Sequence, residues 1–253
     1  MTKIIICGIL GKMGSVVMEE CFESDDVAVV AGVDKQSGVL ANIPLFDSFE
    51  KCNVNADVVV DFSSSVMCEQ IVSYCEKTKT ALVLCTTGYS DAQLEKISQL
   101  SKIVPVFKSA NLSFGIAVVK AVAAKMAIVL KNDFDIEILE KHHNKKVDAP
   151  SGTAIMLADA INDACGKEYE YVYERQSVRK PREKKELGIS SIRGGTIVGE
   201  HEIMFAGVDE VITLTHSAAS KTVFAKGAIT AAKFLSKQKP GRYDMDNIAS
   251  TII

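Results

Sequence analysis

The feature that most constrains the fold is a glycine-rich turn near the start of the chain. Residues 3–7 (KIIIC) form a short apolar run, and residues 8–14 (GILGKMG) follow with three glycines. A helical pattern then leads to a second apolar run at residues 27–33, which ends at Asp34. Strand, glycine turn, helix, strand and acid come in this order in dinucleotide-binding units, where the turn amides face the pyrophosphate and the acid binds a ribose hydroxyl.

The identity of the nucleotide stays open at this point. Leu10 occupies the middle glycine position of the usual GxGxxG pattern, and Gly11 comes one place later. The turn is therefore also compatible with a plain strand-to-helix connection. Asp34 favours NAD because a carboxylate binds ribose hydroxyls, whereas the adjacent Lys35 could bind the 2′-phosphate of NADP. The pattern predicts a nicotinamide cofactor, NADH or NADPH, without choosing between them.

Three more apolar runs continue the pattern of the first half. They cover residues 57–62, 81–84 and 103–107, and helical stretches follow the first two. Strands this apolar are expected in a parallel sheet that is covered on both faces, and their carboxyl ends line the ligand crevice. Small polar residues follow these strands: Ser63-Ser64-Ser65, Thr86-Thr87-Gly88 and Ser109-Ala110-Asn111.

The second half has a different order of elements. The apolar residues 112–130 predict a buried core helix, and residues 134–140 alternate as in a half-buried strand. Strand-like segments then recur without intervening helices, at residues 189–192, 197–205 and 210–216. Consecutive strands indicate a mixed or antiparallel sheet. We therefore expect an α/β protein with an N-terminal Rossmann-type parallel sheet plus a second α+β domain. The polar, basic residues 166–188 are expected to form a solvated loop.

A basic stretch lies between the alternating strand and the next helix. Residues 137–154 read EILEKHHNKKVDAPSGTA and bring His142, His143, Lys145, Lys146 and Asp148 close together. Ser151 is a good helix N-cap, and the free amides of a first helical turn bind anions such as a carboxylate or a phosphate. Imidazole and ammonium groups can also donate protons. The alternative is an inert, solvated basic loop.

Composition limits the classes of partner and the compartment. The net charge is −3, which gives no electrostatic reason to expect nucleic acid or a membrane surface. No segment approaches the roughly 20 apolar residues of a membrane helix. Seven cysteines occur without a CxxC pair, which predicts free thiols in a reducing compartment and neither a disulfide frame nor a metal site. We expect a cytoplasmic protein.

Taken together, these motifs resemble the 4-hydroxy-tetrahydrodipicolinate reductase (dihydrodipicolinate reductase) family of the diaminopimelate route to lysine. The resemblance covers essentially the whole chain, and the HHNKKVDAPSGTA segment is its most specific part. The other matching motifs are Gly8 to Gly14, Asp61-Phe62-Ser63, Thr86-Thr87-Gly88, Ser109 to Ser113, Arg193-Gly194-Gly195, Gly199-Glu200-His201 and Tyr243-Asp244-Met245.

The resemblance implies a position for the cofactor, NADH or NADPH. The turn would hold it through Gly8, Ile9, Leu10, Gly11, Lys12 and Met13. Asp34 and Lys35 would lie at the adenosine ribose. The nicotinamide end would meet Cys85, Thr86, Thr87, Ala110, Asn111, Leu112 and Ser113. Two positions depart from the family, because Cys85 often is glycine there and some members have glycine at Leu10.

The resemblance also implies the reaction, the reduction of 4-hydroxy-tetrahydrodipicolinate to tetrahydrodipicolinate with loss of water. His142 would be the active-site histidine and Lys146 the proton donor, although either could supply the proton. His143, Gly152 and Thr153 would hold the carboxylates of a small cyclic dicarboxylate. Residues 1–111 and 217–253 would form the dinucleotide-binding domain. Residues 112–216 would form the substrate-binding domain, whose sheet would assemble a homotetramer.

Two other functions remain as alternatives. A semialdehyde-type dehydrogenase needs a nucleophilic cysteine, for which Cys85 is the candidate at a predicted strand end. A buried structural thiol is the simpler interpretation of Cys85. A nucleotide sensor would keep the fold and bind the cofactor without turnover, but the presence of His142, His143 and Lys146 disfavours it.

Overall fold

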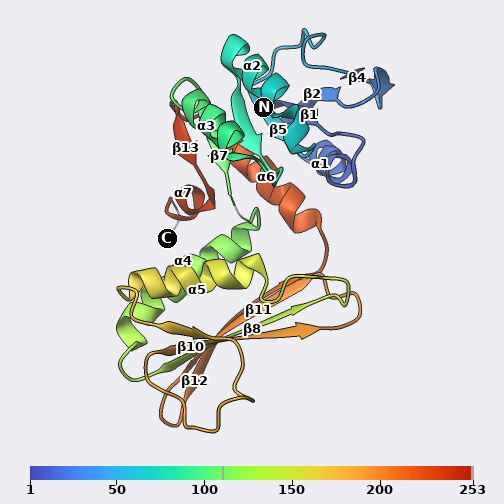
Figure 1. Cartoon of the computed structure of the whole chain (residues 1–253). Coiled ribbons are helices and arrows are strands. Elements are labelled where there is room, and N and C mark those ends of the chain that lie inside the picture. Colours follow the sequence, from blue (N-terminus) through green and yellow to red (C-terminus); the bar gives the residue numbers. More distant parts are fainter. Residues whose placement is uncertain (110, 252–253) are drawn as a thin grey trace. The chain divides into compact units, whose positions relative to one another are not determined.

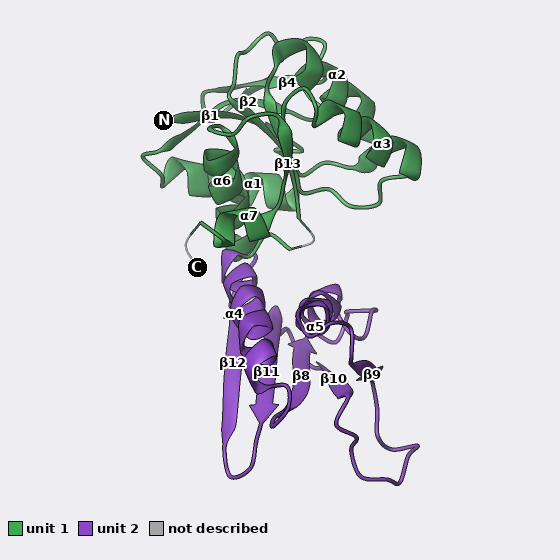
Figure 2. Ribbon diagram, turned by 90° about the vertical axis from the view of Figure 1, so that its left-hand side faces the viewer, with its two compact units in different colours: residues 1–113, 222–252 green, residues 114–221, 253 purple. Residues whose placement is uncertain are grey.

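The chain folds into two units, seen in a computed structural model that describes residues 1–109 and 111–251 (Figure 1). Among the described residues, unit 1 consists of residues 1–113 and the returning segment 222–251, and unit 2 consists of residues 114–221 (Figure 2). The chain thus leaves unit 1 once, completes unit 2 and returns. Among the described residues, no helix is long and apolar enough to cross a membrane.

Unit 1 is built on an eight-stranded sheet with the order β13-β7-β6-β5-β1-β2-β4-β3. All neighbouring strands pair in parallel except β3 and β4. The strands are β1 (Thr2–Cys7), β2 (Val27–Val33), β3 (Gly38–Leu40), β4 (Ile43–Phe46), β5 (Val58–Asp61), β6 (Ala81–Leu84), β7 (Pro105–Lys108) and β13 (Gly241–Tyr243). The predicted parallel sheet is confirmed, whereas the short strands β3, β4 and β13 had no clear signal in the sequence.

Helices cover both faces of this sheet, which explains why its central strands are apolar throughout. The helices of unit 1 are α1 (Lys12–Phe22), η1 (Ser65–Met67), α2 (Cys68–Thr78), α3 (Asp91–Leu100), α6 (Thr222–Leu235) and α7 (Met245–Ala249). Helices α2 and α3 share one hydrophobic cluster with the sheet, and α6 packs on α1 and the central strands. Consequently every side chain of residues 58–60 in β5 is fully buried. Full burial of apolar strands is the main stabilising term of such a sheet.

Unit 2 combines a five-stranded mixed sheet with two helices. The strand order is β12-β11-β8-β10-β9, in which β8, β10 and β9 run parallel and β11 is antiparallel to both β8 and β12. The elements are α4 (Phe114–Leu130), β8 (Asp135–His142), α5 (Gly152–Ala164), β9 (Glu170–Val172), β10 (Glu186–Arg193), β11 (Gly199–Ala206) and β12 (Val211–Ala218). The mixed sheet predicted for the second half is confirmed.

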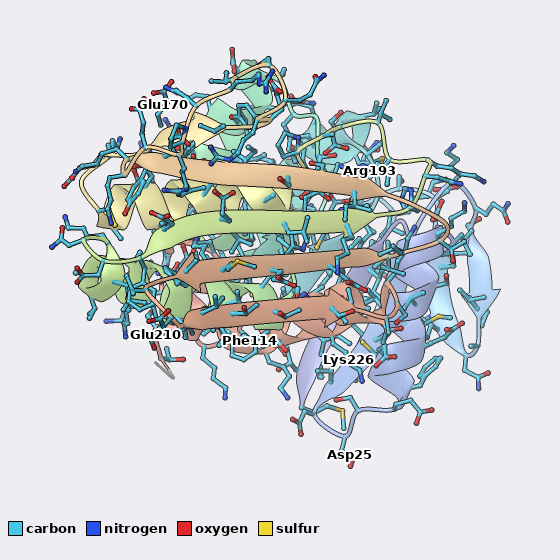
Figure 3. The ribbon with its side chains drawn as sticks, turned by 90° about the horizontal axis from the view of Figure 1, so that it is seen from below. Asp25, Phe114, Glu170, Arg193, Glu210 and Lys226 are labelled. Atoms are coloured by element: carbon cyan, nitrogen blue, oxygen red, sulfur yellow. The ribbon has the colours of Figure 1, made fainter. Side chains whose placement is uncertain are left out.

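Strand β8 places polar side chains on the covered face of this sheet. Its burial alternates, so that Ile136 and Ile138 pack against α4 and α5, and Glu140 and His142 are buried in the same phase. Figure 3 shows the opposite face of the sheet, with the two helices behind it. A carboxylate and an imidazole thus occupy positions that the period of the strand assigns to the covered side.

The expectation of a solvated loop over residues 166–188 was wrong in part. This segment contains β9 and the start of β10, and two of its arginines form ion pairs with acidic side chains of the sheet. Arg182 Nη1 lies 2.9 Å from Asp135 Oδ1, and Arg175 Nη2 lies 2.9 Å from Glu137 Oε1. A Cβ at position 188 would come within 1.8 Å of Glu137 Oε2, so Gly188 leaves the space that this carboxylate occupies. The basic residues therefore balance the acidic residues of β8.

Candidate functional site

In unit 1, the glycine turn borders a pocket of about 610 Å³. The pocket is lined by Cys7, Gly8, Leu10, Gly11, Val33, Asp34, Lys35, Asp47, Phe62, Ser63, Ser64, Val66 and Met67. Gly8 has a φ of +79°, and a Cβ there would lie 2.8 Å from the carbonyl of Phe62. Only glycine fits both the left-handed conformation and this close approach. The turn therefore allows the close backbone approach, and the adjacent pocket provides the space, that a bound dinucleotide needs.

Asp34 is fixed at the rim of the turn by two backbone amides. Its Oδ2 accepts a hydrogen bond from the Leu10 amide at 2.9 Å, and its Oδ1 accepts one from the Lys35 amide at 2.8 Å. Helix α1 begins directly after Gly11, which has no side chain to cap the first amides. Amides at a helix start without intrahelical partners favour an anion such as a pyrophosphate. An acid beside free helix amides is the arrangement predicted for a nucleotide site.

The other predicted cofactor residues lie in different places. Ile9 is fully buried and packs against Gly32, so only its backbone is available to a ligand, and Lys12 and Met13 form the first turn of α1. Thr86 and Thr87 follow β6, and Asn111 to Ser113 follow β7. Both groups therefore lie at the ends of adjacent strands, β6 and β7, and do not line the pocket. Ala110 lies outside the described residues.

The segment after β7 is folded by its own side chains. Ser109 Oγ donates to the carbonyl oxygen of Asn111 at 2.8 Å, and Asn111 Oδ1 accepts from the Ser113 amide at 2.7 Å. Leu112 is buried, and its carbonyl oxygen would lie 1.7 Å from a Cβ at position 227. Gly227 of α6 therefore permits the close packing of Leu112.

The state of Cys85 does not support the cysteine-nucleophile alternative. All seven cysteines are free thiols, and Cys85 alone is half-buried while the other six are buried. Desolvation, and then the negative charge of Asp61, raise the pKa of Cys85 well above its ordinary value. Because the thiolate is the nucleophilic form, a raised pKa makes this side chain unreactive at neutral pH.

In unit 2, a buried carboxylate organises the basic stretch. Glu140 is fully buried, and its Oε2 lies 2.6 Å from His142 Nδ1. Arg193 donates to both carboxylate oxygens, at 2.8 and 2.7 Å, and the Ser151 amide donates to Oε1 at 3.0 Å. Burial alone raises the pKa of Glu140, but the hydrogen bonds from Arg193 and its other donors lower it to about 2. Glu140 is therefore a fixed negative charge.

This charge determines which nitrogen of His142 carries the proton. A carboxylate at Nδ1 accepts a hydrogen bond, so Nδ1 is protonated and Nε2 is the nitrogen left for exchange. A Cβ at position 199 would lie 3.1 Å from His142 Nε2, so Gly199 of β11 leaves room for this edge of the ring. The pair Glu140 and His142 thus has the geometry of an oriented acid or base.

A second histidine completes the buried cluster. Ser151 caps α5, with its Oγ accepting from the Ala154 amide at 3.1 Å and hydrogen-bonded to His201 Nε2 at 3.0 Å. The rings of His201 and His142 lie edge to face, with centroids 5.2 Å apart. Burial, and then the nearby His142, lower the pKa of His201 to about 4. His201 is therefore neutral at pH 7 and packs beside His142.

The loop that carries Lys146 is held in place by the same arginine. Arg193 Nη2 donates to the carbonyl oxygen of Asp148 at 2.7 Å, and Lys146 Nζ lies 2.8 Å from Asp148 Oδ1. The hydrogen bond from Lys146 lowers the pKa of Asp148. Lys145 is exposed and lies outside this arrangement. The structure therefore brings Lys146, and not Lys145, to the buried cluster of Glu140.

One buried nitrogen without a partner among the described residues lies in this loop, which leads to the start of α5. The Nδ1 atom of His143 is buried and has no hydrogen-bond partner among the described residues. Gly152 and Thr153 begin α5, and open space surrounds the Cβ position of Gly152. Buried polar atoms in folded proteins are almost always paired, so this unpaired nitrogen makes His143 a candidate for contact with a ligand.

The sequence did not single out four residues of this cluster as site residues: Glu140, Ser151, Arg193 and His201. The sequence did contain a signal for Glu140: it is a charged residue at a position that the strand period predicts to be buried, two places before His142. Arg193 and His201 stood only within family motifs. Their role depends on β10 and β11 flanking β8, a pairing over many residues of sequence that local patterns do not contain.

The fold and the glycine-turn pocket define a nicotinamide-dinucleotide oxidoreductase of the two-domain α/β type. Family models described as dihydrodipicolinate reductase match residues 2–112 (N-terminus) and 115–249 (C-terminus). The chain belongs to the 4-hydroxy-tetrahydrodipicolinate reductase (dihydrodipicolinate reductase) family. Enzymes of this family are NAD(P)H-dependent oxidoreductases in the diaminopimelate route to lysine.

Relatives match over nearly the full length. The 4-hydroxy-tetrahydrodipicolinate reductase of Caldanaerobacter subterraneus subsp. tengcongensis is 48% identical, and that of Clostridium novyi is 45% identical, each over 98% of both chains. A dihydrodipicolinate reductase from Paenisporosarcina sp. TG-14, solved with dipicolinate bound, has a similar fold. Its TM-score is 0.83 at 23% identity, covering 98% of this chain and 99% of that one.

Substitution of Glu140 by Gln tests the role of the buried carboxylate. The neutral amide does not stabilise a protonated His142, so we expect kcat to fall roughly tenfold or more. Because the pKa of Glu140 is depressed to about 2 from 4.5, its contribution to stability is present above about pH 4.5 and is lost as the pH falls through 2. Between about pH 5 and pH 2, unfolding free energy should therefore drop by ~3 kcal/mol less in the variant.

The matched control is Glu170→Gln, at the exposed start of the edge strand β9 in the same sheet. This control variant should have the kcat of the wild type, and its unfolding free energy should decrease between about pH 5 and pH 2 as it does in the wild type. Urea unfolding at several pH values and steady-state kinetics give both quantities. Equal kcat in Glu140→Gln and wild-type protein would contradict the proposed orientation of His142.

Proposed function

We propose that this chain reduces 4-hydroxy-tetrahydrodipicolinate to tetrahydrodipicolinate, with loss of water, using NADH or NADPH. The observation that carries the proposal is the buried Glu140 and His142 pair next to the loop that holds Lys146. We assign dinucleotide binding to unit 1, and substrate binding and assembly to unit 2. Family membership supports the reaction, and the two sites supply the groups that it needs.

The residues of unit 1 fit a nicotinamide dinucleotide. The cradle at Gly8 and the free amides at the start of α1 suit the pyrophosphate, and Asp34 with Lys35 suits the adenosine ribose. We propose that the nicotinamide end contacts two segments. The first is Cys85, Thr86 and Thr87 after β6, and the second is the run of residues after β7, including Ala110. When bound, the cofactor supplies a hydride. The chain's own residues bind it, orient it and hold it at the strand ends.

The residues of unit 2 fit a small cyclic dicarboxylate. His143, Gly152 and Thr153 are proposed to hold its carboxylates, because the Nδ1 atom of His143 is buried without a partner among the described residues and the start of a helix favours anions. The dipicolinate bound to the Paenisporosarcina relative is a ligand of this class. Fixed donors of this kind orient a substrate without the cost of reorganising the site.

Proton transfer then falls to His142 or Lys146. His142 has one exchangeable nitrogen, Nε2, because Glu140 holds the proton on Nδ1. Lys146 is an ammonium group held by Asp148, with further N–H bonds free to rotate toward an acceptor. Either group can protonate the ring atom that gathers negative charge after hydride addition. We propose Lys146 as the donor and His142 as the residue that completes the active site.

A coupled assay tests the function directly. Dihydrodipicolinate synthase, pyruvate and aspartate semialdehyde generate the substrate, and absorbance at the nicotinamide band reports consumption of NADH and of NADPH in separate reactions. We expect consumption that depends on the synthase. The ratio of the two rates measures what Asp34 and Lys35 select. Cofactor binding without consumption would instead support the sensor alternative.

Substitution of Lys146 by Ala tests the proton donor. If Lys146 is a general acid, kcat should fall about a hundredfold or more. The matched control is Lys145→Ala, which removes the same charge from the adjacent, exposed position and should leave kcat within about twofold. If Lys146→Ala has a kcat close to that of the wild type, Lys146 is not the proton donor and His142 is the remaining candidate.

We propose that the protein is a cytoplasmic homotetramer that binds neither nucleic acid nor membranes. The sheet of unit 2 supports the assembly, because α4 and α5 cover only one of its faces among the described residues (Figure 3). The other face carries half-buried apolar side chains such as Leu139 and Met204 between ion pairs such as Lys141 with Glu200. A self-complementary surface of this kind suits symmetric assembly.

Sedimentation equilibrium tests the assembly. A homotetramer has about four times the chain mass of 27.3 kDa. Replacing Met204 by Lys places a charge on the open face and should shift the protein toward smaller species, whereas Lys51→Met on unit 1 should not. A monomer at micromolar concentration in the wild-type protein would refute the tetramer.

A further inference from the structure

A second buried carboxylate lies in unit 1, outside the residues discussed so far for the cofactor. Asp61 ends β5 and is fully buried. Its Oδ1 accepts hydrogen bonds from the amide and the hydroxyl of Ser63, and its Oδ2 accepts one from the Tyr89 hydroxyl at 3.0 Å. No cation pairs with Asp61 among the described residues. Its charge therefore depends on these three donors.

The two oxygens of Asp61 reach two different loops. Ser63 belongs to the loop after β5 and lines the glycine-turn pocket. Tyr89 belongs to the loop after β6, directly behind Thr86, Thr87 and Gly88. One carboxylate thus joins a wall of the nucleotide pocket to the segment proposed for the nicotinamide.

A second bond runs parallel to this one. Gln93 Nε2 donates to the carbonyl oxygen of Ser65 at 2.7 Å, and Gln93 Oε1 accepts from the Ser90 amide at 2.9 Å in the capping box of α3. The loop after β6 is therefore tied to the loop after β5 at two successive points, first through Tyr89 and then through the start of α3.

The loop needs such an anchor because of Gly88. This glycine has a φ of +77°, and a Cβ there would meet no atom within 4 Å. Neither packing nor a side chain restrains the backbone at this position, and glycine has the widest choice of conformations. The hydroxyl of Tyr89 remains a donor at neutral pH, since burial and then the charge of Asp61 raise its pKa above the ordinary value.

We propose that Asp61 and Tyr89 are positioning residues that hold the turn at residues 86–88 ready for the nicotinamide. The proposal rests on the cofactor function assigned to unit 1. Without the Tyr89 hydroxyl, the turn samples conformations that do not bind the nicotinamide, and binding must first select the correct one. The adenosine end is unaffected, because Asp61 still holds Ser63 and the glycine turn is unchanged.

Tyr89→Phe tests this proposal in the full-length protein, with two ligands that differ only at one end. ADP-ribose lacks the nicotinamide and reports on the glycine-turn pocket alone, whereas NADH reports on both ends. We expect calorimetry to show about tenfold weaker NADH binding and ADP-ribose binding within twofold of wild type. The KM for NADH should rise by a similar factor, with a smaller change in kcat.

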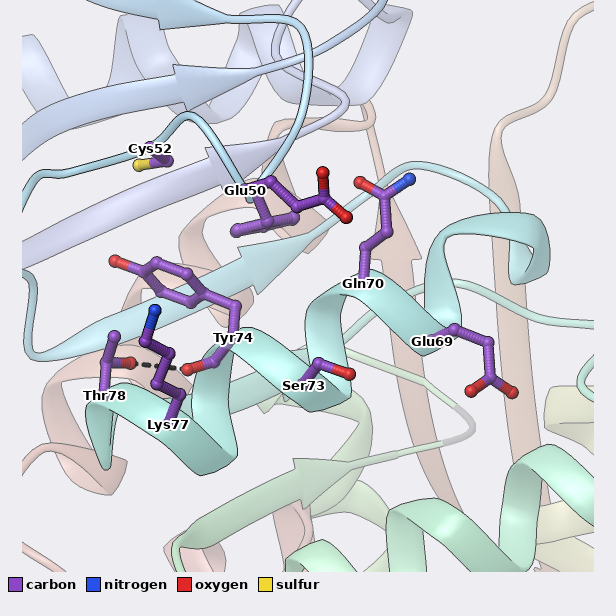
Figure 4. Close-up of a pocket in the computed structure, with 9 residues that line it drawn as sticks. Glu50, Cys52, Glu69, Gln70, Ser73, Tyr74, Lys77 and Thr78 are labelled. Carbon is purple, nitrogen blue, oxygen red and sulfur yellow. Dashed lines mark hydrogen bonds between the residues drawn. The ribbon is translucent and has the colours of Figure 1, made fainter.

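Tyr74→Phe is the matched control. Tyr74 is a buried tyrosine of unit 1, and its hydroxyl donates to the carbonyl oxygen of Val54 at 2.8 Å. It lines a separate pocket of about 340 Å³ along α2 (Figure 4). The substitution removes the same atom from a similar environment, so thermal stability should fall in both variants, and NADH affinity only in Tyr89→Phe.

A further variant, Gln93→Ala, removes the bond to Ser65 and should weaken NADH binding about threefold, again without changing ADP-ribose binding. The proposal is refuted if Tyr89→Phe binds NADH as tightly as the wild type, or if it loses NADH and ADP-ribose affinity equally. Failure of the wild-type protein itself to bind NADH would refute the cofactor assignment instead. The two failures are thus distinguishable in one set of titrations.

Discussion

The structure of the candidate active site depends on the buried negative charge of Glu140. An isolated carboxylate in a protein interior is very costly, so the fold must deliver donors to it from several directions. Arg193 of β10, the amide of Ser151 and the ring of His142 all converge on this one side chain. The charge is therefore fully compensated, and the three segments that compensate it are fixed relative to one another. A site made of loop residues thereby acquires the rigidity of the sheet.

The same physical solution occurs in unit 1. Asp61 lies at the carboxyl end of a strand in the parallel sheet, and Glu140 lies close to the carboxyl end of β8. In both places, a carboxylate in the covered layer accepts hydrogen bonds from the loop that follows its own strand and from a neighbouring segment. Loops carry function but are inherently mobile, and buried charge-assisted hydrogen bonds restrict them more strongly than apolar contacts do. The buried acids thus connect stability to the geometry of binding.

The sequence predicted those parts of the structure that depend on local patterns. The glycine turn, the apolar central strands and the mixed character of the second sheet are confirmed, because period and glycine spacing are properties of neighbouring residues. The expectation for residues 166–188 was wrong in part, because Arg175 and Arg182 are paired by acids about forty residues earlier. The arginine that pairs with Glu140 could not be predicted either. Arg193 comes from β10, more than fifty residues later, and only sheet pairing brings it to Glu140.

The hydrogen bonds that satisfy the Glu140 carboxylate also affect which ligand groups the site favours. Glu140 uses the donors of Arg193 and the Ser151 amide, so it does not compete for the donors that lie beyond it. The Nδ1 atom of His143 remains, buried and without a hydrogen-bond partner among the described residues. A buried donor of this kind favours a ligand that carries an acceptor, since a ligand without acceptors leaves the donor unpaired. Because Glu140 is satisfied by the chain's own donors, we propose that the donor of His143 is left for an acceptor on the substrate.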